Sequence, residues 1–99
     1  MLMIEAEISK QRLDHYLNLT TTAREKVNVM QHLSVQQQHD VQVLLEMADA
    51  YIADAHYFSK QGDYIRSFGA INYAHAWIDA GVKLRLLDGQ GDDVLFTLP

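Results

Sequence analysis

The fold is decided by the stretch Lys60-Gln61-Gly62-Asp63-Tyr64, where two long amphipathic segments meet. Gly62 can take the left-handed conformation that commonly follows the end of a helix. Asp63 can cap the N-terminus of the helix that comes next. The connection is therefore only about two residues long, and a link that short forces the two helices to lie antiparallel.

Apolar residues at alternating spacings of three and four predict a helix on each side of this turn. The first covers residues 35–61 and opens at Ser34, with Gln37 at the capping-box spacing. The second covers residues 64–87 and ends where the Asp- and Gly-rich stretch 88–93 begins. We call the stripe of core-facing positions along a helix its seam. The seam of the first helix consists of Val41, Leu45, Ala48, Ile52, Ala55 and Ser59. The seam of the second consists of Tyr64, Phe68, Ile71, His75, Ile78 and Val82.

A third helix is predicted upstream, over residues 10–30. Ser9 can cap it, and Ile8 and Leu13 occupy the positions of a hydrophobic staple. Its seam consists of Leu13, Tyr16, Thr20, Ala23, Val27 and Met30. We therefore expect an all-α protein, an antiparallel up-and-down three-helix bundle that forms a single domain over residues 1–99.

The tail over residues 88–99 ends in an apolar stretch and needs a surface to cover it. At 3.6 residues per turn, Tyr73, Trp77 and Leu84 gather on the side of their helix opposite its seam. A helix that is apolar on two faces must bury both. We expect the tail to pack on this helix, against that second face. Alternatively, the face pairs with a partner subunit.

Composition narrows the function classes. The chain carries 13 acidic and 8 basic residues, a net charge of −5, and its basic residues form no cluster, which argues against nucleic acid as a partner. It has no cysteine, which excludes disulfides and thiolate chemistry. No apolar run has the length of a membrane span or of a signal peptide, so we expect no membrane partner and a cytoplasmic location.

The candidate ligand site lies around His75, which falls on the seam of its helix. Asp79 follows one turn later and Asn72 precedes it by three residues. Such a pair could orient a general base or help to hold a ligand, with His56 meeting it across the hairpin. The structural interpretation, which we favour, is a core histidine whose ring is hydrogen-bonded by Asp79. No motif of metal-binding spacing exists, so we expect no metal and no cofactor.

Several elements of the hairpin resemble the archaeal family called domain of unknown function 357. They are Asp54-Ala55, Tyr57-Phe58, Gly62-Asp63, Asn72-Tyr73-Ala74-His75, Trp77 and Asp79-Ala80-Gly81, with Leu95-Phe96 in the tail. The resemblance spans nearly the whole chain and implies an archaeal source and a left-handed up-and-down three-helix bundle. It implies no activity. The chain departs from the family pattern at Ser67, where a small residue is expected, and at Ala76, where glycine is expected.

Two functions remain open. The first, which we favour, is a non-enzymatic protein-interaction or accessory module that binds a protein partner or a second copy of itself. Its interface residues would be Tyr73, Trp77, Leu84 and Phe96. The second is a small-ligand or metal-binding site, with or without catalysis. Its residues would be Asn72, His75, Asp79 and His56.

Overall fold

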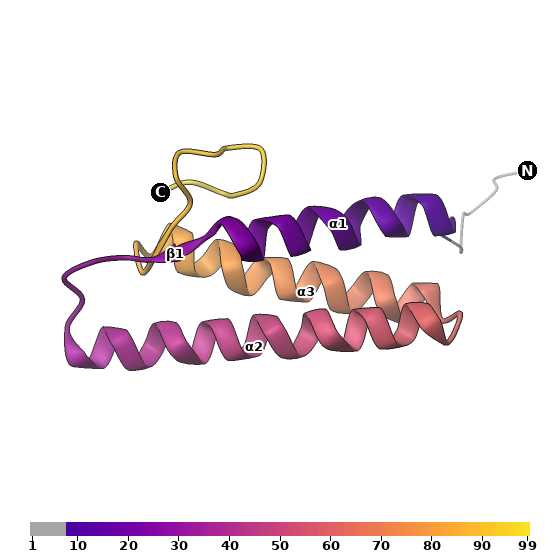
Figure 1. The fold of residues 1–99 in the computed structure, drawn as a ribbon, viewed down its shortest axis with the longest axis horizontal. Coiled ribbons are helices and arrows are strands. Elements are labelled where there is room, and N and C mark those ends of the chain that lie inside the picture. The colour runs from indigo at the N-terminus through magenta and orange to yellow at the C-terminus, as the bar shows by residue number, and fades with distance from the viewer. Residues whose placement is uncertain (1–7) are drawn as a thin grey trace, which may run out of the picture.

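The computed structural model describes residues 8–99 and confirms the three-helix, all-α fold. The helices are α1 (Lys10–Lys26), α2 (Val35–Lys60) and α3 (Tyr64–Lys83). They form a rod of 54 × 25 × 21 Å in which α2 runs antiparallel to the other two (Figure 1). The most extensive packing is between α2 and α3, and α1 packs mainly on α3.

Each helix begins at the cap that the sequence predicts. The Ser9 hydroxyl accepts from the backbone N–H of Arg12, and Asp63 accepts from that of Arg66. Ser34 and Gln37 form the reciprocal capping box, in which each side chain accepts from the backbone N–H of the other residue. These bonds satisfy donors that a helix N-terminus otherwise leaves free.

The turn between α2 and α3 has the predicted left-handed glycine, with φ of 77° at Gly62. The N–H of Gly62 donates to the carbonyl of Ser59, and the N–H of Asp63 donates to that of Phe58. This pair of bonds is the Schellman motif, which satisfies carbonyls at a helix C-terminus. The two helices then pack so closely that the buried Ser67 hydroxyl donates to a carbonyl of α2.

The buried side chains form two clusters along the rod. The cluster nearer the Gly62 turn consists of Leu13, Leu17, Ala55 and Ile71. The cluster nearer the tail consists of Ala23, Val27, Val41, Ala48, Ile78, Val82, Leu86, Leu87 and Phe96. Removing a large apolar side chain from water contributes roughly 1.5–3 kcal/mol, so both clusters stabilise the bundle.

Two helices end about one turn before the predicted position. The first stops at Lys26 rather than at residue 30, because Val27 is extended. The chain then forms strand β1 (Asn28–Val29), which pairs antiparallel with β2 (Leu87–Asp88). β-Branched residues favour such extended backbone.

The third helix stops at Lys83 rather than at residue 87. Arg85 takes a left-handed conformation with φ of 61°, and the chain folds back so that Leu87 is buried. Its return places Leu87 directly on Gly81, where an added Cβ would lie 2.5 Å from Leu87 Cδ1. Glycine is the residue that allows this approach.

The tail packs on α3, but not against the face that we predicted. It lies over the junction between α1 and α3, on the side away from α2 (Figure 1). There Phe96 is buried among residues of the tail-side cluster. Tyr73 and Leu84 stay exposed, and Trp77 packs at the edge of the core. The predicted side was wrong because the tail binds to polar side chains of α3, as described below.

Candidate functional site

His75 joins three separate parts of the chain. Its Nδ1 lies 2.9 Å from the hydroxyl of Thr20, a buried residue of α1. Its Nε2 lies 2.7 Å from the backbone carbonyl of Leu95 in the tail. A carbonyl can only accept, so Nε2 carries the hydrogen, and in the neutral ring Nδ1 accepts from the Thr20 hydroxyl. Both ring nitrogens are therefore occupied in holding α1, α3 and the tail together.

Asp79 binds the tail rather than His75. Its carboxylate accepts from the backbone N–H of Thr97 at 2.9 Å, with the Thr97 hydroxyl at 3.4 Å. The distance from Asp79 Oδ1 to His75 Nε2 is 3.8 Å, which is too long for a hydrogen bond. The predicted partner of His75 was thus wrong, although the prediction of a histidine with hydrogen-bonded nitrogens agrees with this geometry. Asp79 and His75 form successive attachment points for the tail.

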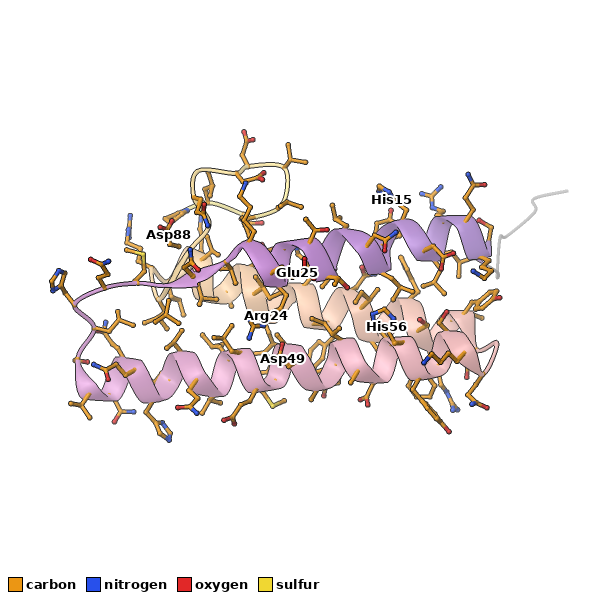
Figure 2. The ribbon with its side chains drawn as sticks, viewed as in Figure 1. His15, Arg24, Glu25, Asp49, His56 and Asp88 are labelled. Atoms are coloured by element: carbon orange, nitrogen blue, oxygen red, sulfur yellow. The ribbon has the colours of Figure 1, made fainter. Side chains whose placement is uncertain are left out.

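The other two predicted site residues lie differently. Asn72 is exposed and lines a shallow hollow of about 250 Å³. The hollow is bounded by Tyr16, Leu19, Thr20, Asn72, His75, Ala76 and Asp79. His56 lies exposed on α2 (Figure 2). It is not among the residues that line the hollow. The structure therefore brings Asn72, His75 and Asp79 together but leaves His56 outside the group.

Within residues 8–99, no three histidine, aspartate or glutamate side chains come close enough together to hold a metal ion. Zinc sites in proteins ordinarily use three or four protein ligands. What remains around His75 is a shallow hollow of mixed polar and apolar lining, beside a ring that is already hydrogen-bonded on both sides. Tyr16 and Asn72 also line this hollow.

The predicted interface residues divide between surface and core. Tyr73 is 49% exposed and Leu84 is 66% exposed, whereas Phe96 is buried. The Tyr73 ring packs edge-on against Tyr51 of α2, with ring centroids 4.5 Å apart, and against Trp77 at 6.1 Å. Edge-to-face contacts of this kind are a favoured geometry for aromatic pairs. Three of the four residues thus share one side of the α2–α3 hairpin.

The indole N–H of Trp77 is buried and has no hydrogen-bond acceptor. A buried donor without a partner is uncommon in folded proteins. Trp77 lies between the tail-side cluster and the ring of Tyr73. Its position shows that the aromatic side of the hairpin continues directly into the core.

Ion pairs tie α1 to its neighbours on both sides. Arg24 reaches α2 and donates to both carboxylate oxygens of Asp49, at 2.7 and 3.1 Å (Figure 2). Lys26 donates to Asp92 of the tail at 2.8 Å. This hydrogen bond, with a second from the backbone N–H of Leu95, holds the pKa of Asp92 below its ordinary value. The tail is therefore anchored at both α1 and α3.

Three side-chain contacts were missed by the sequence analysis: Thr20 to His75 between α1 and α3, and, from the tail, Asp92 to Lys26 and the carbonyl of Leu98 to Lys83. Thr20 lies on the predicted seam of its helix, where a buried hydroxyl needs a hydrogen-bond partner. Its position on the seam could therefore have indicated a polar contact across the core. The other two pairs join residues far apart in the chain. No local spacing indicates them.

No helix within residues 8–99 is both long and apolar enough to cross a bilayer. No curated protein and no solved structure matches the chain. A family model described as "Protein of unknown function (DUF357)" matches residues 15–87, which include most of α1, all of α2 and α3, and β1. The chain therefore belongs to this family, domain of unknown function 357.

Proposed function

We propose that the protein is a non-enzymatic interaction module, and that it binds a second copy of itself through one side of the α2–α3 hairpin. We call this side the hairpin face. It consists of Val43, Met47, Tyr51, Tyr73, Trp77 and Leu84. The observation that carries the proposal is the exposure of Tyr73 and Leu84 beside the half-buried Trp77.

The composition of the hairpin face is that of an interface centre. Aromatic residues and methionine are enriched at the centres of protein interfaces, while charged residues are depleted there. The face has three aromatic rings in a row, in which Tyr73 packs edge-on against both Tyr51 and Trp77. Val43 extends it along α2 and is 42% exposed. The tail covers a different side of the bundle, so nothing within residues 8–99 competes for this surface.

Charge at the edge of the hairpin face favours a second copy as the occupant. At helical spacing, Asp54 continues the α2 part of the face past Tyr51, and Arg66 lies seven residues before Tyr73, so both charges stand toward the Gly62 turn. In a two-fold contact with the axis along the rod, α2 of one copy faces α3 of the other. Asp54 of each copy then meets Arg66 of the other, so opposite charges pair twice at this end of the face.

Sedimentation velocity over the micromolar range tests the proposal. We expect a concentration-dependent dimer, and we expect Leu84→Glu to weaken it by at least about tenfold, because a charge would be desolvated at the contact. Ile65→Glu is the matched control, since Ile65 is 64% exposed on the same helix but lies by the Gly62 turn, outside the hairpin face.

Two results would overturn the proposal. One is a wild-type protein that stays monomeric throughout the micromolar range. The other is a dimer that Leu84→Glu and Ile65→Glu affect equally, because the contact would then lie elsewhere.

A further inference from the structure

A second hollow, of about 420 Å³, lies at the opposite end of the rod from the Gly62 turn. Its apolar lining comes from Met30, Val82, Leu87 and Leu98, and its charged lining comes from Arg85 and Asp88. The hollow is open to solvent on one side and is distinct from the hairpin face. Small-molecule sites commonly have volumes of roughly 300–1,000 Å³ with mostly apolar walls and a few polar groups.

Arg85 stands at a position where glycine would be expected. Its N–H donates to the carbonyl of Val82, and the next N–H, of Leu86, donates to that of Gly81. These are the two bonds of a Schellman motif, whose left-handed residue is usually glycine. Arg85 has φ of 61° and keeps a side chain there despite the steric cost. Strain of this kind is a reason to look for a function of the side chain.

The guanidinium of Arg85 forms no ion pair or side-chain hydrogen bond with any of residues 8–99, whereas Arg24, Lys26 and Arg66 all pair with aspartates. Asp88 is the acidic group of the same hollow. One of its oxygens accepts from the backbone N–H of Gln90 at 2.8 Å, and no cationic group of residues 8–99 lies within 4 Å of the carboxylate. The hollow therefore presents one free positive group and one free negative group above an apolar floor.

The geometry points to a binding site for a small zwitterion with an apolar body, of which free apolar α-amino acids are the simplest examples. The ligand carboxylate would bind the guanidinium of Arg85, a planar group well suited to carboxylates. The ligand ammonium would bind Asp88. The apolar side chain would rest on Val82, Leu87 and Leu98. This inference does not depend on the proposed function.

Calorimetric titration of the whole protein with L-leucine tests the inference. We expect saturable binding to one site, and at least about tenfold weaker binding of glycine, N-acetyl-leucine and leucine amide, since each lacks one of the three recognised groups.

The substitution Arg85→Gly separates binding from folding. Glycine relieves the left-handed backbone, so the midpoint of thermal unfolding should not fall, yet affinity for L-leucine should fall by at least about tenfold. Arg12→Ala is the control, because Arg12 is an exposed arginine at the far end of the rod, and affinity should be unchanged.

Equal affinity for leucine and glycine, or for leucine and either blocked form, would overturn the inference, as would undetectable binding of L-leucine. It would also fail if Arg85→Gly bound as tightly as the wild type. A lower unfolding midpoint for Arg85→Gly would assign the arginine to stability rather than to a ligand.

Discussion

The C-termini of α2 and α3 use the same backbone device with different residues. Both end in a Schellman motif. In each motif the left-handed residue donates its N–H to the carbonyl three residues earlier, and the following residue donates its N–H to the carbonyl five residues earlier. The left-handed residue is Gly62 in the first motif and Arg85 in the second. Glycine adopts this conformation without a steric penalty, whereas another L-residue is disfavoured by about 1–2 kcal/mol.

The same difference extends to the two ends of the rod. At the end formed by the α2–α3 turn, the left-handed residue is a glycine, Gly62. At the tail end, three residues other than glycine are left-handed: His32, Arg85 and Gln90. Such residues persist where the surrounding contacts over-determine the backbone. The tail end is therefore the part of the molecule whose stability depends most on long-range contacts.

The largest expected effect comes from removing the main apolar contact of the tail. Phe96→Ala should lower the free energy of unfolding by about 3–5 kcal/mol, because a buried aromatic side chain leaves a cavity beside Val82 and Gly89. Urea denaturation measures the change. Val94→Ala, at a position 81% exposed, should change it by no more than about 0.5 kcal/mol. Equal effects of the two substitutions would mean that the tail does not hold this end together.

A smaller effect is expected at His75, the point where the tail meets both parallel helices. His75→Ala should cost about 2 kcal/mol, because the buried Thr20 hydroxyl and the Leu95 carbonyl lose their partners. Thr20→Val should cost less in the His75→Ala background than in the wild type, since the two residues are coupled.

The alternative ligand site around His75 predicts another result. Zinc or a nucleotide would then raise the unfolding midpoint of the wild type but not of His75→Ala or Asp79→Ala. A structural role predicts no ligand-dependent shift in any of the three proteins.

The smallest effects, of opposite sign, are expected at the two left-handed residues themselves. Gly62→Ala should destabilise the protein by about 1 kcal/mol, because φ of 77° is unfavourable for alanine. Arg85→Gly should leave stability unchanged or raise it by up to about 1 kcal/mol. Thermal unfolding of both variants beside the wild type checks the signs. Destabilisation by both substitutions would show that the two motifs do not differ in backbone strain.

Local signals made most of the fold predictable. Ser9, Ser34, Gly62 and Asp63 mark helix ends through bonds to neighbouring residues, and these were assigned correctly. The end of α3 was missed because Arg85, rather than glycine, occupies its left-handed position. The end of α1 was missed because β1 pairs with a strand about sixty residues away, and a pairing of that separation has no local signature.

The candidate site was less predictable for a related reason. The hydrophobic pattern assigned the tail to the apolar side of α3. The tail instead lies on the flank that carries His75, Asp79 and Lys83, where polar side chains satisfy its backbone groups. Apolar periodicity records which side chains avoid water. It does not record which side chains will bind the backbone of a distant segment.

The division of the core into two clusters determines which part of the molecule opens locally first. A fluctuation that releases the tail uncovers only the cluster containing Phe96, while Leu13, Leu17, Ala55 and Ile71 remain packed. Amide protons in the last turns of α3 and in β1 then exchange with solvent through partial opening, ahead of those around Ile71. The tail end of the rod thus opens before the rest of the molecule. A compound that binds the tail would slow amide exchange at that end alone.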